Sequence, residues 1–399
     1  MNYRETLEYI HSLGNFGLPA GLDRIKKVLN QLGNPQNEFK AIHIAGTNGK
    51  GSVTAFVSSV FKEAGYKTGT FISPYIIDFR ERIQINGEYI SEADLTRYAE
   101  IVKQTGVKLT EFEFITALAF LYFKEQKIDI LVCETGLGGR FDATNTLENK
   151  VVTVITKIGM DHTAVLGDTI EKIAEEKCGI FRSCPTVTTP FQDKKALEVI
   201  KSKTANLIIP DISKLDGEGN TYIYKGKKFE ISLLGDFQTE NSLVAIETVK
   251  NSGFDIPYNT IYKGLKNTFF PARLEIISKK PLILLDGAHN PDGACVLAKE
   301  LSKFKEKPTA IVGMMKDKNV REVLNEVLKH CASAVCVTVP NNPRSMSGEE
   351  LSEIASEFCN CSVADSLEMA IEKTKEQNTV IFGSLYLASA IRPLLLEKN

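Results

Sequence analysis

The sequence predicts an α/β protein with largely parallel sheets in two domains. Short apolar runs rich in β-forming residues alternate with segments of helical periodicity, which is typical of parallel α/β folds. Three of these runs, at residues 41–45, 128–133 and 151–156, are apolar on both faces, as strands buried between helix layers are. The length of 399 residues is also too great for one ordinary core, so we expect two domains.

The composition is that of a globular protein without a nucleic-acid or membrane partner. Hydrophobic residues make up 43% and charged residues 25% of the chain, and the net charge of −2 leaves no basic excess for nucleic acid. No apolar run is long enough to cross a bilayer, and the first residues do not read as a signal peptide. The eight cysteines contain no Cys-x-x-Cys pattern, which disfavours a zinc site or a disulfide framework. We expect a cytoplasmic protein with reduced thiols.

Residues 43–52, His-Ile-Ala-Gly-Thr-Asn-Gly-Lys-Gly-Ser, lead from the first strand into a helix and predict a phosphate-binding loop. Glycines let backbone N–H groups face an anion, the helix N-terminus adds a positive dipole, and Lys50 and Ser52 add a charge and a hydroxyl. The general P-loop pattern has four residues between its first glycine and the Gly-Lys pair, whereas only two follow Gly46. The loop is therefore a variant, and an ordinary glycine-rich turn is the alternative.

The elements that follow are predicted from turn and helix-start signals. Residues 81–90 predict a small β-ribbon that projects from the body, because they contain an Asn-Gly hairpin signal, and residues 91–94 predict a helix start. Residues 185–235 show β-like alternation, residues 238–251 are helical, and residues 269–273 predict a link between domains. The candidate strands of the second domain are residues 282–286, 310–314, 334–339 and 380–383.

Two polar residues follow buried strands of the first domain, at the edge where parallel sheets bind ligands. Glu134 ends the run at residues 128–133 and precedes three glycines, an arrangement that suits Mg²⁺ next to phosphate because Mg²⁺ prefers oxygen ligands. His162 follows the run at residues 151–156 and is one of five histidines. A solvated loop acid and a structural histidine are the alternatives.

Lys177 falls on the apolar face of a predicted helix, because Ile170, Ile173 and Ala174 precede it at helical spacing. Burial would favour its neutral amine, which can react with CO₂ to form a carbamate with oxygen ligands for a metal ion. Alternatively, Lys177 extends to solvent and complements the dipole at the helix end. Spacing alone favours this second interpretation.

The second domain has candidate residues at the end of its first strand. Asp286 can bind a ribose hydroxyl, and His289 can contact a substrate or a phosphate. The alternative is an ordinary helix entry at Asn290-Pro291. Arg273, in the predicted link, can reach a transferred phosphoryl group, although its spacing alone proves nothing.

In their order along the chain, these segments resemble the folylpolyglutamate synthase/dihydrofolate synthase branch of the Mur ligase family. The resemblance covers nearly the whole chain, and its segments are highly specific together although each is weak alone. The matching segments are residues 45–52, 73–74, 81–83, 86–87, 134–145, 158–167, 176–180, 237–238, Asn241, and residues 271–275, 286–291 and 383–387.

The resemblance implies an N-terminal P-loop ATPase domain with a parallel sheet, at residues 1–272, and a C-terminal Rossmann-like α/β domain, at residues 273–399. It also implies a reaction in which ATP phosphorylates a carboxylate of pteroate or folate to an acyl phosphate. The amine of L-glutamate then displaces phosphate to form an amide. The implied partners are these small molecules, with no nucleic acid and no membrane, and the family suggests a monomer.

The resemblance assigns roles residue by residue. The implied ATP-binding positions are Asn48, Gly49, Lys50, Gly51, Ser52, Asn241, Arg273, Asp286 and His289. The implied ligands of two Mg²⁺ ions are Ser73, Glu134, His162 and Lys177, the last matching a carbamylated lysine. The implied dihydropteroate-binding positions are Thr110, Glu111, Phe141, Asp142 and Ala143. The implied catalytic residues are Lys50, Lys177, Arg273 and His289. At Lys177 the resemblance thus reverses the interpretation from spacing.

The sequence departs from the family pattern at a few positions. Tyr75 stands where the family often has histidine, which puts the substrate preference in question. Cys178 and Ala272 are smaller exchanges. Two other functions stay open: another Mur-type amino-acid ligase, and a nucleotide-gated P-loop binding protein. A binding protein would need neither a buried Lys177 nor a second domain with Asp286.

Overall fold

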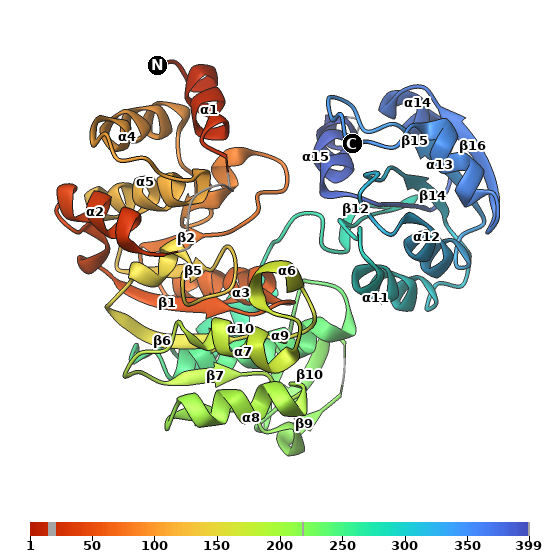
Figure 1. Ribbon diagram of the computed structural model, residues 1–399. Coiled ribbons are helices and arrows are strands. Elements are labelled where there is room, and N and C mark those ends of the chain that lie inside the picture. The colour runs from red at the N-terminus through yellow and green to blue at the C-terminus, as the bar shows by residue number, and fades with distance from the viewer. Residues whose placement is uncertain (15–20, 218, 398–399) are drawn as a thin grey trace. The chain divides into compact units, whose positions relative to one another are not determined.

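The computed structural model describes residues 1–14, 21–217 and 219–397, and the chain divides into two compact units (Figure 1). Unit 1 comprises Met1–Tyr75, Arg80–Ser232 and Asp236–Phe269. Unit 2 comprises Ile76–Phe79, Leu233–Gly235 and Phe270–Asn399. Both are mixed α/β units with largely parallel sheets, as the sequence predicts.

In the described part of unit 1, the main sheet has eight strands in the order β4-β3-β2-β5-β1-β6-β7-β8. In this sheet order, the six strands from β2 to β8 are parallel to their neighbours, whereas β3 and β4 pair antiparallel at one edge. The strands are β1 Lys40–Ala45, β2 Thr68–Phe71, β3 Ile83–Ile85, β4 Glu88–Tyr89, β5 Ile130–Glu134, β6 Lys150–Ile155, β7 Thr186–Thr188 and β8 Leu207–Ile208. The loops after β1 and its neighbours β5 and β6 therefore leave the same edge of the sheet.

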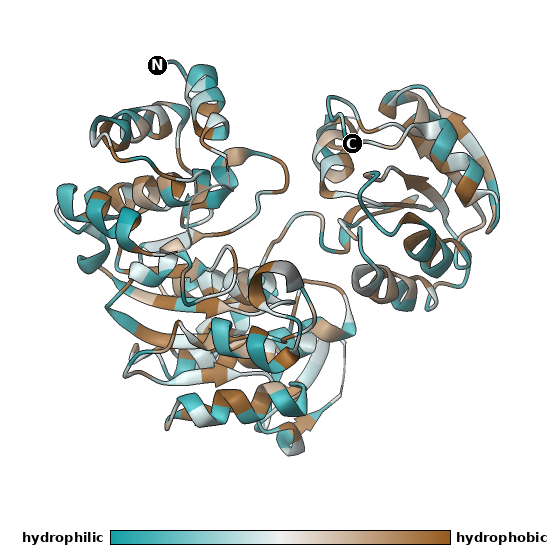
Figure 2. Ribbon diagram, viewed as in Figure 1, coloured by the Kyte–Doolittle hydropathy of each residue, from teal (hydrophilic) through white to brown (hydrophobic). Residues whose placement is uncertain are grey.

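The three apolar runs predicted as strands are β1, β5 and β6, with bounds shifted by one or two residues. All three are buried along nearly their whole length, and brown predominates along them in Figure 2. The predicted hairpin is also present, as Asn86 and Gly87 take positive φ angles of 53° and 79° between β3 and β4. The prediction that this ribbon projects from the body was wrong, because β3 pairs with β2 and extends the main sheet.

Helices cover the main sheet of unit 1. They are α1 Tyr3–Ser12, α2 Asp23–Gln31, α3 Lys50–Glu63, α4 Glu92–Gln104, α5 Glu111–Glu125, α6 Thr163–Leu166, α7 Ile170–Cys178, α8 Lys194–Lys203, α9 Asp236–Lys250 and α10 Tyr258–Lys266. Helix α3 packs on α9 and α10, while α7 and α8 pack together over the ends of β1 and β6. The helix starts predicted at Ser91 and near Gln238 are confirmed by α4 and α9.

Residues 185–235 hold more than the predicted strands. Besides β7 and β8, a small antiparallel sheet contains β9 Leu215–Asp216, β10 Thr221–Tyr224 and β11 Lys227–Glu230. The prediction missed α8, whose side chains Ala196 and Ile200 are buried against α7. Its amphipathic face is short, and four lysines in ten residues weaken the apolar signal.

In unit 2, the described residues form a six-stranded sheet in the order β12-β13-β17-β14-β15-β16, parallel except for β12. The strands are β12 Glu275–Lys279, β13 Leu282–Leu285, β14 Thr309–Val312, β15 Ser333–Val337, β16 Asn360–Ala364 and β17 Thr379–Phe382. The helices are α11 Pro291–Leu301, α12 Val320–Leu328, α13 Gly348–Ala355, α14 Leu367–Thr374 and α15 Leu385–Glu397. The four predicted strands are present, and the two edge strands β12 and β16 were missed.

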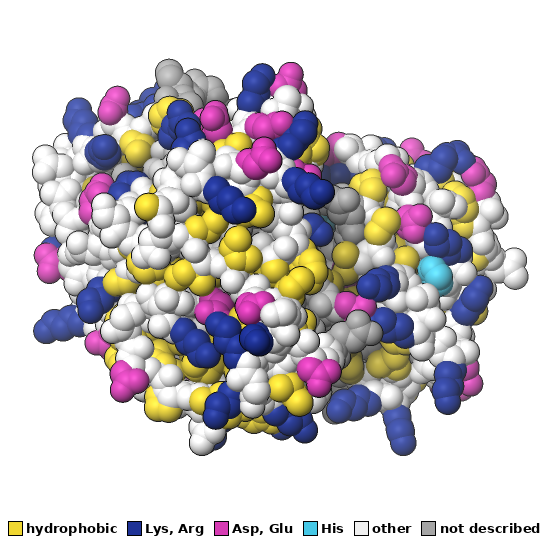
Figure 3. All heavy atoms as spheres, turned by 90° about the horizontal axis from the view of Figure 1, so that it is seen from below, with side chains coloured by type: hydrophobic (Ala, Val, Ile, Leu, Met, Phe, Trp, Pro, Cys, Tyr) yellow, Lys and Arg dark blue, Asp and Glu magenta, His cyan; other side chains and the backbone are white. Residues whose placement is uncertain are grey.

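The surface agrees with the near-zero net charge. On the face drawn in Figure 3, lysine and arginine side chains are interspersed with aspartate and glutamate. The described helices include none that is long and apolar enough to cross a membrane.

Candidate functional site

The loop after β1 is held by the segment that follows β6. The backbone N–H groups of Thr47 and Asn48 donate to Lys157 O over 3.0 and 3.1 Å. The Thr47 hydroxyl also donates to Gly159 O at 3.2 Å and lies 3.1 Å from Gly159 N. A Cβ on Gly46 would lie 1.8 Å from the Thr156 hydroxyl, so no side chain fits there. The short glycine spacing thus belongs to a loop pressed against the neighbouring strand.

Helix α3 begins directly at this loop and is held by α9. Gly49 precedes the helix with a φ of 91°, and a Cβ there would lie 2.5 Å from Asn241 Oδ1. The buried Ser52 hydroxyl accepts a hydrogen bond from Gln238 Nε2 at 3.2 Å. Gln238 Oε1 in turn accepts from Asn241 Nδ2 at 3.0 Å. The structure thus brings Asn241 to the predicted ATP-binding loop through Gln238, a residue without a predicted role.

A buried carboxylate faces the same loop. Glu134, at the C-terminal end of β5, is 5% exposed, and its Oε1 lies 3.9 Å from Lys50 Nζ. The backbone N–H of Ser73, just after β2, donates to Glu134 Oε2 at 3.4 Å. The guanidinium of Arg82 donates to the Ser73 hydroxyl at 3.1 Å. The structure therefore brings together Lys50, Ser73 and Glu134. The oxygens of Ser73 and Glu134 are of the kind that Mg²⁺ prefers.

Lys177, on α7, contacts the predicted phosphate-binding loop. It sits in the last turn of α7, is 4% exposed, and its Nζ donates to Gly46 O at 2.7 Å. Burial, with a smaller contribution from Lys50, lowers the pKa of Lys177 to about 7. The interpretation from spacing alone, that the side chain extends to solvent, is wrong because the amine has a buried carbonyl partner. The site therefore contains an amine that is readily neutral.

His162 is less closely tied to the other predicted ligands. It precedes α6 with a φ of 48°, its side chain is 57% exposed, and it lies 3.7 Å from Asp161 Oδ2. Within residues 1–14, 21–217 and 219–397, the structure forms no group of three or more His, Cys, Asp or Glu side chains arranged to hold a metal. The predicted set of metal ligands stays a prediction.

The loop of residues 137–146, called here the 137–146 loop, is organised by its own aspartate. Asp142 Oδ2 accepts from the Leu137 N–H at 2.8 Å, and Oδ1 accepts from the Thr144 N–H at 3.0 Å and from its hydroxyl. Burial raises the pKa of Asp142, although these hydrogen bonds oppose the shift. Next to it, Ala143 is buried, whereas Phe141 is 53% exposed. Among the predicted dihydropteroate-binding positions of this loop, Phe141 is therefore the one whose side chain is open to a ligand.

A buried histidine on β1 holds the same loop. His43 is fully buried, and its Nε2 lies 2.8 Å from the Thr144 hydroxyl. Because that hydroxyl donates its single hydrogen to Asp142, it accepts from His43, which fixes the Nε2–H tautomer. Burial lowers the pKa of His43 well below its usual value, so the ring is neutral. Its Nδ1 has no hydrogen-bond partner among the described residues.

The predicted positions Thr110 and Glu111 begin α5. The Thr110 hydroxyl accepts from the Glu113 N–H at 3.3 Å, and Glu113 reaches back to the Thr110 N–H at 2.8 Å, which forms a capping box. Glu111 Oε2 lies 3.5 Å from His11 Nδ1 on α1. The cap fixes where these two residues stand at the start of the helix.

In unit 2, the predicted residues meet at the C-terminal end of β13. Asp286 Oδ2 accepts from the Leu274 N–H and Oδ1 from the Ala288 N–H, both at 2.8 Å. Burial raises the pKa of Asp286, and the nearby Arg273 opposes this shift. His289 Nδ1 lies 2.8 Å from Gly287 O. Asp286 and His289 thus follow β13, and Arg273 precedes the neighbouring antiparallel strand β12. The Asn290-Pro291 helix entry stands beside them as the start of α11.

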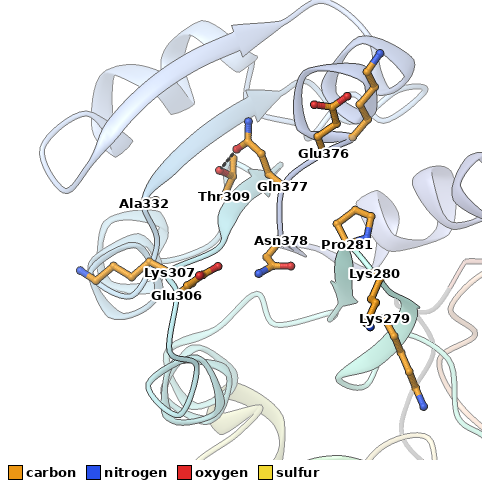
Figure 4. A pocket seen from close by; sticks show the side chains of 11 residues that line it. Lys279, Lys280, Pro281, Glu306, Lys307, Thr309, Ala332, Glu376, Gln377 and Asn378 are labelled. Carbon is orange, nitrogen blue, oxygen red and sulfur yellow. Dashed lines mark hydrogen bonds between the residues drawn. The ribbon is translucent and has the colours of Figure 1, made fainter.

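A cavity of about 730 Å³ lies at the opposite edge of this sheet (Figure 4). Its lining includes Thr309 and Asn378, at or beside the N-terminal ends of β14 and β17. In Figure 4, Lys279 and Lys307 extend away from its centre. Ligands of parallel sheets bind at the C-terminal ends of the strands, so this cavity is not part of the candidate site.

Comparison with known proteins gives matches over nearly the whole chain. The Mur ligase middle domain matches residues 44–249, and the Mur ligase glutamate ligase domain matches residues 272–384. The chain is 35% identical to the folylpolyglutamate synthase of Lacticaseibacillus casei, over 99% of each chain. It is 37% identical to the dihydrofolate synthase/folylpolyglutamate synthase of Bacillus subtilis, over 98% of this chain and 99% of that protein.

Solved structures agree with these matches. Escherichia coli FolC in complex with DHPP and ADP superimposes with a TM-score of 0.88 at 26% identity, covering 100% of this chain and 98% of that one. The folylpolyglutamate synthase of Thermotoga maritima gives a TM-score of 0.87 at 35% identity, covering 100% of this chain and 97% of that one.

Proposed function

Because the chain belongs to the folylpolyglutamate synthase/dihydrofolate synthase branch of the Mur ligase family, we propose that it joins L-glutamate to dihydropteroate, to reduced folates, or to both. The observation that carries this proposal is the placement of Lys177. A buried, readily neutral amine on the carbonyl of Gly46 serves no purpose in a simple nucleotide switch. The proposed domains are residues 1–272 and 273–399.

ATP is the proposed phosphoryl donor. In unit 1, the backbone of residues 48–52 and the side chains of Lys50, Ser52 and Asn241 would hold its phosphates, since the loop joins a strand to a helix N-terminus. In unit 2, Arg273, Asp286 and His289 are proposed nucleotide contacts. The ADP in the Escherichia coli FolC structure supports this assignment.

Magnesium is the proposed metal. The oxygens of Ser73 and Glu134, with His162 and a carbamate on Lys177, would hold two Mg²⁺ ions. Bound there, Mg²⁺ would neutralise phosphate charge during transfer. The buried Glu134 next to Lys50 supports the first site. The neutral amine of Lys177 supports the carbamate, because only an uncharged amine reacts with CO₂.

The proposed chemistry has two steps. A carboxylate oxygen of the acceptor attacks the γ-phosphorus of ATP, the bond to the bridging oxygen breaks, and ADP leaves. The neutral amine of glutamate then attacks the acyl carbon, phosphate leaves with the bonding electrons, and the nitrogen loses a proton. Lys50 and Arg273 would stabilise charge on the transferred phosphoryl group, which needs positioning more than covalent help.

The proposed acceptor site includes Thr110, Glu111 and the 137–146 loop. Phe141 is open to a ligand, whereas both oxygens of Asp142 serve the loop itself. Asp142 would therefore act by shaping the loop around the acceptor. Tyr75, whose ring lies 5.1 Å from the Arg82 guanidinium, is the residue that would tune the acceptor preference.

The test is an incubation with ATP, Mg²⁺, L-glutamate and either dihydropteroate or a reduced folate. We expect ADP to form only when an acceptor and glutamate are both present. ADP release with neither substrate would favour a nucleotide switch, and ADP release with a muramyl nucleotide would favour another Mur-type ligase. Either result would overturn the proposal.

The acyl phosphate has a test of its own. An acceptor labelled with ¹⁸O in its carboxylate should transfer one ¹⁸O atom to the released phosphate, because that oxygen bridges carbon and phosphorus in the intermediate. Phosphate without label would exclude the intermediate.

A further inference from the structure

Lys150 is a buried lysine for which the proposed reaction has no use. It begins β6, is 7% exposed, and its Nζ donates to Asn145 Oδ1 at 2.7 Å and to Ile180 O at 2.9 Å. Burial, with a smaller contribution from Arg182, lowers the pKa of Lys150 to about 7. Burying an amine costs free energy unless it is hydrogen-bonded, so the two partners of Lys150 indicate which contacts its burial serves.

Its partner Asn145 bonds in two directions. The Asn145 Nδ2 donates to Arg140 O, within the 137–146 loop, and to Gly179 O, just after α7, each at 3.0 Å. Arg182 also donates to the backbone carbonyl of Asn145 at 3.0 Å. One amide thus joins the loop to the end of α7, and Lys150 orients that amide while binding the next carbonyl of the same turn.

The backbones of the loop and of α7 are in direct contact at this point. The Arg140 N–H donates to Glu176 O at 2.8 Å. A Cβ on Gly139 would lie 2.7 Å from the carbonyl oxygens of Glu176 and Lys177. A Cβ on Gly179 would lie 2.5 Å from Arg140 Cα. No side chain fits between the loop and the turn that carries Lys177.

We propose that Lys150 and Asn145 are positioning residues, which fasten the 137–146 loop to the last turn of α7 so that the acceptor-binding loop and Lys177 keep one fixed geometry. The proposal rests on the proposed function for the roles of Phe141 and Lys177. Strand β6 would then support two loops: the segment after it holds the loop after β1, and Lys150 at its start holds the 137–146 loop. Loss of the fastening would disturb the acceptor and Lys177 together, while the nucleotide loop keeps its own contacts with α9.

Lys150→Met tests this proposal, because methionine keeps much of the buried volume and removes the amine that makes both hydrogen bonds. Lys67→Met is the matched control: Lys67 precedes β2 and its Nζ likewise donates to a carbonyl and an amide oxygen, both of Gln126. We expect Lys150→Met to raise the KM of the acceptor at least tenfold and to lower kcat, with the KM of ATP within twofold. Lys67→Met should leave all three within twofold.

Hydrogen exchange gives a readout that does not depend on activity. In Lys150→Met, we expect faster exchange in both residues 137–146 and 173–180, and unchanged exchange in residues 50–56, where α9 holds the start of α3. Equal rises in the KM values of acceptor and ATP, or unchanged exchange in the two segments, would overturn the proposal. If the wild-type protein forms no ADP with any acceptor, the proposed function fails, and the exchange result still decides on the fastening.

Asn145→Asp covers the case in which Lys150→Met does not fold. The carboxylate keeps an acceptor for Lys150 but loses the donors to Arg140 O and Gly179 O. We expect the KM of the acceptor to rise while the KM of ATP stays within twofold. We also expect faster hydrogen exchange in residues 137–146 and 173–180. Wild-type kinetics and exchange in this variant would contradict the proposed fastening.

Discussion

The two ends of α3 carry glycines that differ in one respect. Gly49 before the helix and Gly65 after it have φ angles of 91° and 84°, so alanine at either position is forced into the left-handed region. A Cβ on Gly49 would lie 2.5 Å from Asn241 Oδ1, whereas a Cβ on Gly65 would meet nothing within 4 Å. The pair therefore separates backbone strain from the contact with Asn241.

The expected magnitudes follow from these contacts. Both substitutions cost about 1–2 kcal/mol of unfolding free energy as left-handed strain. Gly49→Ala also pushes Asn241 away by roughly an ångström, since ordinary contact begins at 3.4 Å, and breaks its hydrogen bond to Gln238. That bond is worth about 1 kcal/mol, so we expect about 2–3 kcal/mol for Gly49→Ala. If Asn241 contacts the nucleotide, ATP affinity should fall at least tenfold, which is about 1.4 kcal/mol.

The assay combines urea unfolding with calorimetric titration of a non-hydrolysable ATP analogue. Gly65→Ala should lose stability but bind the analogue as the wild type does. In an Asn241→Ala background the collision is absent, so Gly49→Ala should then cost no more stability than Gly65→Ala. Equal losses of affinity in the two glycine variants, or a double variant whose loss is the sum of the single losses, would refute the reasoning.

Three further predictions concern single residues. Because the pKa of Lys177 is about 7 in the folded protein and 10.5 in the unfolded chain, the unfolded chain holds more protons between these pH values. The unfolding free energy of the wild type relative to Lys177→Met should therefore rise by about 1.4 kcal/mol per unit between pH 8 and 10, and a flat difference in urea titrations would contradict the burial. Lys177→Ala should retain its circular dichroism spectrum and lose most glutamate-dependent ADP formation; near-normal turnover would remove the carbamate from the mechanism. Asp286→Asn turns an NH₂ group toward a backbone N–H, so the unfolding free energy of unit 2 should fall by about 1–3 kcal/mol, and an unchanged urea midpoint would speak against the two hydrogen bonds.

Much of the site was readable from sequence because its residues follow buried strands. The runs that became β1, β5 and β6 have no polar face, and the side chains after them meet at one sheet edge. Glu134 and Lys50 are each predicted at this edge, and the structure places Glu134 Oε1 3.9 Å from Lys50 Nζ. The edge strands β12 and β16 were not predicted, because their exposed positions mix polar and apolar residues.

Contacts between segments far apart in the sequence could not be predicted. Gln238 lies in a segment that matches the family, but its hydrogen bond to Ser52, 186 positions away, has no signal in the sequence. Spacing alone led to the wrong prediction that the Lys177 side chain extends to solvent. Helical periodicity shows which face of the helix carries a lysine, but not whether a buried carbonyl lies within reach of its amine. The family resemblance supplied that missing information.

The packing of α3 also has a consequence for protein synthesis. The Ser59 hydroxyl donates to Gly264 O at 2.7 Å, and a Cβ on Gly264 would lie 2.5 Å from Val60 Cα. A growing chain that has reached residue 235 therefore carries the complete glycine-rich loop but neither of the helices α9 and α10 that cover α3. Until the ribosome has added residues 236–266, the side of α3 that packs on α9 and α10 stays uncovered. The first unit therefore completes its fold late in synthesis, with surface exposed that the finished protein buries.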